Sequence, residues 1–82
     1  MTITIRFFAT YRQLTGRDIF ELQVDQTATV NEVIVQLEQQ YPQLAGKLHA
    51  GALVAVNERY AQRERALQPN DTVAFFPPVS GG

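Results

Sequence analysis

Alternating hydrophobic and polar residues predict a strand near the N-terminus, over residues 2–9. Every second side chain in this segment is a large apolar one, and these are Ile3, Ile5 and Phe7. Successive side chains of a strand point to opposite faces of a sheet. The side chains predicted on the other face are those of Thr2, Thr4, Arg6 and Phe8. The pattern therefore indicates a half-buried strand whose outer face carries a cation and an aromatic ring.

A second alternating segment follows a polar connection. Residues 10–16 are mostly polar and end in a glycine, which predicts a turn that contains at most a short helical turn. Beyond it, the apolar residues that share one face are Phe20, Leu22 and Val24. Two successive strands of this kind predict an antiparallel hairpin with a loop longer than the tight types.

Helical spacing is clearest after Thr29. Thr29 and Glu32 have the spacing of a capping box, in which each side chain pairs with the other residue's backbone N–H. The apolar residues that follow with helical spacing are Val30, Val33, Ile34, Leu37 and Tyr41. They would form one apolar stripe, and Pro42 is expected to end the helix.

The last third of the chain predicts two more strands. Residues 43–51 form a connection with at most one short helical turn, and a β-rich segment, 53–56, leads to a turn at 57–59. After an unpatterned stretch and a turn at 68–71, residues 72–76 alternate again. Val73 and Phe75 would share one face, with Ala74 and Phe76 on the other. This order predicts an α+β fold, with one main helix packed on one face of a mixed sheet. We expect a domain over residues 1–76 and an extended tail over residues 77–82.

Composition argues against several classes of function. The net charge is −1 without a basic stripe, so nucleic-acid binding is not expected. No apolar run approaches the roughly 20 residues that span a membrane, and no signal peptide is recognisable. We therefore expect no membrane association and a cytoplasmic protein. The chain has no cysteine, which excludes disulfides and thiolate chemistry.

Conventional catalysis has few candidate residues. The single histidine, His49, is predicted in a loop, and the eight carboxylates show no ligand spacing or pairing. The glycines form no phosphate-binding fingerprint. We expect no bound cofactor and no metal. A chain of this kind would take part in a reaction as a carrier, a substrate or a subunit.

The C-terminus is the most unusual part of the sequence. Pro77 and Pro78 follow the last predicted strand directly, and the chain ends in Val79-Ser80-Gly81-Gly82. Prolines keep the chain extended, and glycines without Cβ can pass through a narrow channel. The tail could then bring the Gly82 carboxylate to another protein's active site. Because a carboxylate is ionised at neutral pH and is a poor electrophile, it needs activation. The alternative is a frayed end without a role.

Three segments of the chain form a recognisable set: Arg6-Phe7-Phe8-Ala9-Thr10-Tyr11-Arg12, Ala55-Val56-Asn57, and the block from Asp71 to Gly82. Together they resemble the MoaD/ThiS family of ubiquitin-like sulfur carriers, and within it the MoaD small subunits of molybdopterin synthase. Two positions depart from the family pattern. Asn70 stands where glycine is usual, and Gln13 stands where glutamate often follows the arginine. Asn tolerates a left-handed backbone, so the turn at Asn70 is expected to survive.

The resemblance implies a ubiquitin-like β-grasp fold and a specific role for Gly82. An E1-like enzyme would use ATP to adenylate Gly82, and a sulfur-transfer protein would convert the adenylate to a thiocarboxylate. The carrier would then dock on the large subunit of molybdopterin synthase, in a heterotetramer. Sulfur would pass there to cyclic pyranopterin monophosphate, and the catalytic residues would belong to the large subunit.

The partner is expected to contact residues near the tail. Phe8, Phe76 and Tyr60 would form an aromatic docking patch, and Arg12 would contact either the partner or the tail. The alternative for the two phenylalanines is a satellite of the core. Three other functions stay open at this point: a carrier for another pathway such as thiamin synthesis, a ubiquitin-like modifier attached through Gly82, and an interaction module with an inert tail.

Overall fold

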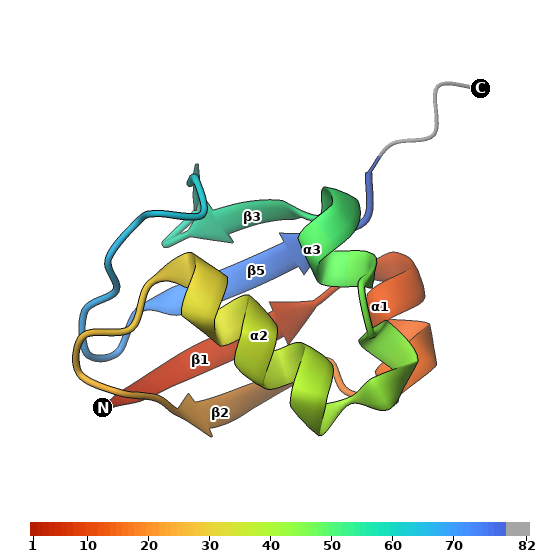
Figure 1. Cartoon of the computed structure of the whole chain (residues 1–82), viewed down its shortest axis with the longest axis horizontal. Helices are drawn as coiled ribbons and strands as arrows, with labels where there is room; N and C mark the ends of the chain where they lie inside the picture. The colour runs from red at the N-terminus through yellow and green to blue at the C-terminus, as the bar shows by residue number, and fades with distance from the viewer. Residues whose placement is uncertain (79–82) are drawn as a thin grey trace.

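Five strands form one mixed sheet in the spatial order β2-β1-β5-β3-β4 (Figure 1). The strands are β1 (Thr2–Phe7), β2 (Ile19–Gln23), β3 (Leu53–Val56), β4 (Arg59–Tyr60) and β5 (Thr72–Phe76). This computed structural model describes residues 1–78. β1 pairs antiparallel with β2 and parallel with β5, and β3 pairs antiparallel with β5. The predicted mixed sheet is confirmed, and β5 is its middle strand.

The main helix, α2 (Val30–Gln40), lies across one face of the sheet (Figure 1). Both halves of the predicted capping box form: Thr29 Oγ1 accepts from the Glu32 N–H at 3.3 Å, and the Thr29 N–H donates to Glu32 Oε1 at 3.2 Å. Of the predicted apolar stripe, the helix buries Val30, Val33, Ile34 and Leu37, whereas Tyr41 is half-buried. Tyr41 is the C-cap residue, and Pro42 follows it as expected.

Three short helical segments were underestimated from the sequence. Residues 9–15 form α1 (Ala9–Thr15), where a turn was predicted, and β1 therefore ends at Phe7 instead of Ala9. The connection after α2 contains η1 (Pro42–Leu44) and α3 (Lys47–Gly51), so His49 lies in a helix and not in a loop. Each segment buries only one side chain, Tyr11, Leu44 or Leu48, and one buried residue gives no period to detect.

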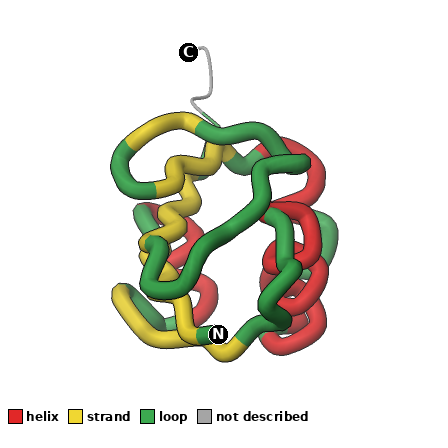
Figure 2. Tube along the Cα trace, turned by 90° about the vertical axis from the view of Figure 1, so that its left-hand side faces the viewer, coloured by secondary structure: helices red, strands yellow, loops and turns green. Residues whose placement is uncertain are grey.

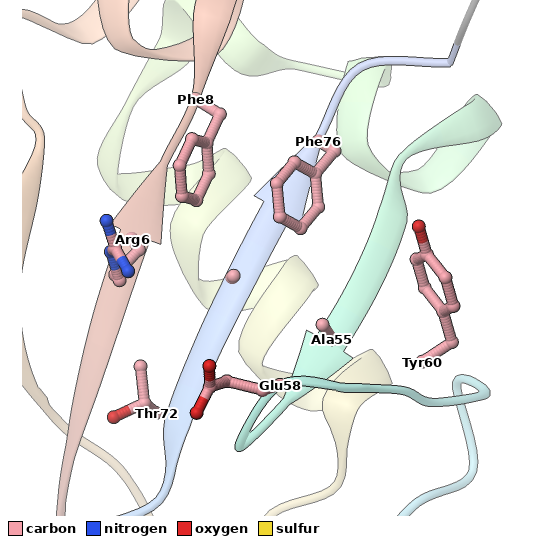
Figure 3. A pocket seen from close by; sticks show the side chains of 8 residues that line it. Arg6, Phe8, Ala55, Glu58, Tyr60, Thr72 and Phe76 are labelled. Atoms are coloured by element: carbon pink, nitrogen blue, oxygen red, sulfur yellow. The ribbon is translucent and has the colours of Figure 1, made fainter.

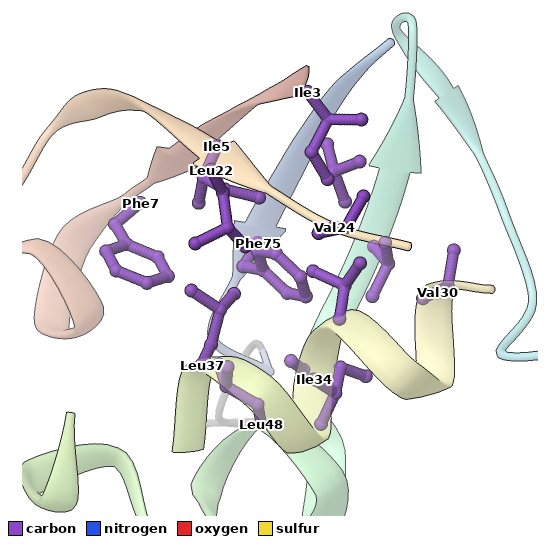
Figure 4. Packing of buried hydrophobic residues seen from close by; sticks show 14 of the residues in the cluster. Ile3, Ile5, Phe7, Leu22, Val24, Val30, Ile34, Leu37, Leu48 and Phe75 are labelled. Carbon is purple, nitrogen blue, oxygen red and sulfur yellow. The ribbon is translucent and has the colours of Figure 1, made fainter. Parts of the chain in front are cut away.

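The core lies between the sheet and α2 (Figure 4). Figure 2 shows the strands separated from most of the helical turns, as two layers. The fully buried side chains of the central strands are those that the alternation predicted: Ile3, Ile5, Phe7, Val73 and Phe75. Phe7 and Phe75 lie opposite each other in the parallel pair, with ring centroids 6.1 Å apart.

Two tight turns use residues that accept a left-handed backbone. Asn57 and Glu58 form the two-residue loop between β3 and β4, with φ angles of 50° and 71°. Positive φ at both loop residues is the signature of a type I′ hairpin, whose twist matches that of its strands. Asn70 has a φ of 70°, so the turn before Asp71 forms as expected without glycine.

Asp71 joins these two turns. It is 6% exposed, and it is the charged residue buried most deeply in residues 1–78. Its carboxylate accepts hydrogen bonds from Asn57 Nδ2 and from the Gln68 N–H, both at 2.8 Å. Asn57 Oδ1 in turn accepts from the Thr72 N–H at 2.9 Å. The turn after β3 is thereby fixed to the first residue of β5.

Within residues 1–78, no helix has the length and apolar character needed to cross a membrane.

We predict that Asp71→Ala lowers the free energy of unfolding by about 1–3 kcal/mol, because it leaves two partly buried N–H donors unpaired. Urea denaturation followed by circular dichroism measures the loss. The matched control is Asp18→Ala, since Asp18 is exposed and, among the described residues, its one hydrogen bond is through its backbone carbonyl, to the Phe7 N–H. Equal losses in the two variants would contradict a specific role for the Asp71 carboxylate.

Candidate docking face and tail exit

The face of the sheet opposite α2 carries a hollow of about 340 Å³ (Figure 3). We call this side of the sheet the open face. The residues that line the hollow are Arg6, Phe8, Ala55, Glu58, Tyr60, Thr72, Ala74 and Phe76. Most of them come from β1, β3 and β5; Phe8 directly follows β1, Tyr60 lies on β4, and Glu58 lies in the β3–β4 turn. The hollow is therefore built by side chains that alternate with those of the core.

Phe8 and Phe76 form the aromatic centre of the open face. Their rings are stacked, with centroids 4.4 Å apart and planes at 16°. Both are half-buried, and neither belongs to the core cluster formed by the described residues. The sequence predicted this face for both rings, and the structure adds that they contact each other. Their role in docking stays a prediction.

The backbone just after Phe8 is strained. Ala9 has a φ of 51°, in the left-handed region that costs a residue with a Cβ about 1–2 kcal/mol. The chain turns there from β1 into α1, while the Phe8 N–H still donates to the Phe75 carbonyl at 3.3 Å. Strain of this kind persists where the surrounding structure fixes it, often at functional sites. Here the hydrogen bond from the Phe8 N–H and the stacking of Phe8 on Phe76 fix the end of β1 against β5.

The other two predicted partner-binding residues lie in different places. Tyr60 is 79% exposed on β4 and lines the hollow, because the type I′ turn brings β4 back along β3. Arg12 is exposed on α1 and does not line the hollow. The structure therefore brings Tyr60 together with Phe8 and Phe76 but leaves Arg12 apart from them.

The tail leaves the sheet next to the stacked rings of Phe8 and Phe76. β5 ends at Phe76, Pro77 is half-buried, and Pro78 is exposed. Pro78 packs against α3, where a Cβ built on Gly51 would lie 3.5 Å from Pro78 Cγ. The predicted tail residues Val79, Ser80, Gly81 and Gly82 lie outside the described residues.

The two charged residues of the hollow, Arg6 and Glu58, were not selected from the sequence. Arg6 was expected on the same face as Phe8, so the alternation of β1 already contained the signal. Glu58 reaches the open face from the β3–β4 turn (Figure 3). Its position depends on the type I′ geometry, which the segment Asn57-Glu58-Arg59 does not reveal by composition alone.

The titratable groups with shifted pKa values lie away from the open face. Burial raises the pKa of Tyr11 in α1, partly opposed by the charge of Arg63. Hydrogen bonds from the Thr27 hydroxyl and N–H lower the pKa of Asp25 in the loop before α2. In the part of the chain that the structure describes, no three His, Cys, Asp or Glu residues gather as a metal site.

Two curated relatives match this chain over nearly its whole length. Small archaeal modifier protein 3 of Haloferax volcanii is 36% identical over 92 aligned positions, which cover 100% of both chains. The molybdopterin synthase sulfur carrier subunit of Haemophilus influenzae is 40% identical over 81 positions, which cover 98% of this chain and 99% of the relative.

Solved structures show the same fold. Small archaeal modifier protein 1 of H. volcanii superposes with a TM-score of 0.83 at 27% identity, covering 95% of this chain and 98% of that one. In the complex of subunits 1 and 2 of the molybdopterin-converting factor from Helicobacter pylori, the matching chain has a TM-score of 0.70 at 22% identity, with 100% of both chains covered. The expected ubiquitin-like β-grasp is confirmed.

The model of the ThiS family matches residues 5–82. This match includes the C-terminal block from Asp71 to Gly82. It also includes Ile5 and Phe7 on the inner face of β1, but not Ile3. The chain therefore belongs to the ThiS family, in agreement with the resemblance of its segments to the MoaD/ThiS sulfur carriers.

Proposed function

We propose that this chain is the sulfur carrier subunit of a molybdopterin synthase. In this proposal, Gly82 carries a C-terminal thiocarboxylate and donates its sulfur to cyclic pyranopterin monophosphate, in the biosynthesis of molybdopterin. The full-length similarity to a molybdopterin synthase sulfur carrier subunit supports this choice within the ThiS family.

The position of β5 is the structural observation on which the proposal depends. β5 is the middle strand, and it carries Phe76 on the open face immediately before Pro77 and Pro78. A partner that packs on the stacked rings of Phe8 and Phe76 would therefore meet the start of the tail. Four residues beyond Pro78, at up to about 3.5 Å each, can reach roughly 14 Å into that partner.

The carboxylate would be activated by another protein. It would attack the α-phosphorus of ATP in the active site of an E1-like enzyme, with release of pyrophosphate. Hydrosulfide delivered by a sulfur-transfer protein would then attack the carbonyl carbon of the acyl-adenylate, AMP would leave, and the thiocarboxylate would remain on Gly82. ATP is thus a substrate of the activating enzyme and not a cofactor of this chain. The thiocarboxylate resides at the chain end, because the sequence has no cysteine to carry sulfur.

The charged carrier would dock on the large subunit, which supplies the residues that act on the pterin. The H. pylori neighbour of the same fold is described in a complex of subunit 1 with subunit 2, which agrees with such a pairing. We place the complex in the cytoplasm as a heterotetramer, with two carriers on a dimer of large subunits.

A second function is supported by a different relative. The similarity to small archaeal modifier protein 3 favours attachment of Gly82 to amino groups of other proteins. Both functions begin with the same acyl-adenylate and differ in the nucleophile that attacks it, sulfur in one case and an amine in the other. Amide-linked adducts in cells, traced to Gly82 by peptide mass spectrometry, would establish the modifier role.

We expect the intact mass to rise by the exchange of one oxygen for sulfur when the protein is incubated with the E1-like enzyme, ATP and a sulfide source. Fragmentation should place the exchange at Gly82. A chain that lacks Gly82 is the control and should keep its mass. An unchanged mass of the full chain, while a known carrier is converted alongside, would contradict the sulfur-carrier function.

Gly82→Ala should keep the fold and weaken sulfur transfer sharply, because the added methyl group would crowd a channel shaped for glycine. Single-turnover assays with the large subunit measure the rate, and the thermal midpoint tests the fold. Ser80→Ala is the matched control, since it changes the tail without adding volume. Full activity of the Gly82→Ala variant would overturn the narrow-channel explanation.

Phe76→Ala should weaken binding to the large subunit by about 1–3 kcal/mol if the stacked rings are a hot spot. Isothermal titration calorimetry measures the affinity, and the unfolding midpoint shows how much of the effect is structural. Val35→Ala, an exposed apolar residue of α2 on the other side of the sheet, is the control. Unchanged affinity would assign Phe76 a structural role only.

A further inference from the structure

Arg6 lies at the border between two hollows of the open face. The first hollow surrounds the stacked rings, and the second is lined by Thr4, Arg6, Ile19, Asn57, Glu58 and Thr72. Ile19 is 57% exposed and lies opposite Arg6 in the β1–β2 pair. Arg6 is the cation that both hollows share. A partner that covers the open face from Tyr60 to Ile19 must therefore cover Arg6.

The Arg6 guanidinium is held in place by the aromatic stack. Its central carbon lies 4.8 Å from the centroid of the Phe8 ring, which in turn stacks on Phe76 at 4.4 Å. The charged group is thus the outer member of a row of three planar groups. A guanidinium fixed in this way loses little side-chain entropy when it binds, since its orientation is set beforehand.

The charge of Arg6 is not fully paired. Its Nε is buried and has no hydrogen-bond partner within residues 1–78. A purely apolar partner surface would remove water from the remaining N–H groups as well, and leaving charged donors unpaired is strongly unfavourable. A carboxylate would satisfy the N–H groups at the end of the guanidinium, because the group can donate two parallel hydrogen bonds to the two carboxylate oxygens.

We propose that the large subunit places the carboxylate of an Asp or Glu side chain against Arg6, flanked by apolar groups that pack on Phe8 and Phe76. This inference rests on the function proposed above and adds the chemistry of the partner surface. Glu58 borders both hollows, so its negative charge opposes an incoming carboxylate. Arg6 then strengthens the binding of an acidic partner surface, and Glu58 weakens it.

The test measures the affinity of four variants for the purified large subunit by isothermal titration calorimetry, at low and physiological salt. Arg6→Leu should bind about 10- to 100-fold more weakly, because the partner's carboxylate loses its counter-charge. Glu58→Gln should bind more tightly, by roughly two- to fivefold, because a like charge is removed. The matched control is Arg17→Leu. Arg17 stacks on Phe20 at 4.5 Å in the same manner but lines neither hollow. The Arg17→Leu variant should therefore bind the large subunit with wild-type affinity.

The outcomes separate the inference from the function on which it rests. If Arg6→Leu binds with wild-type affinity or more tightly, the partner binds this face through apolar contacts, and the inference is overturned. Weaker binding of Glu58→Gln would indicate a basic partner surface and would overturn it as well. Arg6→Lys, which keeps the charge but loses the planar fork, should lie between wild type and Arg6→Leu. If the wild-type chain itself does not bind the large subunit, the proposed function fails and not only the role of Arg6. Unfolding midpoints near that of wild type exclude loss of fold as the cause.

Discussion

The parallel pairing of β1 with β5 is the constraint on which the rest of the structure depends. It joins residues about seventy positions apart and places both strands at the centre of the sheet. On one side the pair buries Phe7 and Phe75 under α2, and on the other it stacks Phe8 on Phe76. Neighbouring residues therefore serve the core and the open face, and substitutions on one side need not disturb the other.

The open face combines features that are usually separate in a small domain. Stacked rings offer apolar area, whereas Arg6 and Glu58 offer charge that a purely hydrophobic partner would not satisfy. Apolar contact supplies most of the affinity at protein interfaces, and charge supplies much of the discrimination between partners. On this face, Arg6 and Glu58 would therefore discriminate between partners that pack equally well on the stacked rings.

Local patterns predicted most of the elements but not their pairing. The capping box at Thr29, the helix that follows it, and the strands at 53–56 and 72–76 were read from spacing and confirmed. α1 and α3 were underestimated, because each buries a single side chain. The contact between Phe8 and Phe76, the type I′ position of Glu58 and the unpaired Nε of Arg6 arise from register and turn geometry. The contact between the two rings depends on residues distant in the sequence, and the turn depends on backbone angles that its residue types do not specify, so no local pattern encodes them.

The late position of β5 also has a consequence for biosynthesis. The chain emerges from the ribosome with its N-terminus first. β1 and β3 both pair with β5, so each lacks this neighbour until residue 76 has emerged. Contacts between such distant residues form slowly, so the sheet closes only once residues 72–76 have been made. A product that stops before β5 would leave β1 and β3 as open edges, which are prone to pair with other chains. Folding of this domain therefore requires synthesis as far as Phe76, because both β1 and β3 pair with β5.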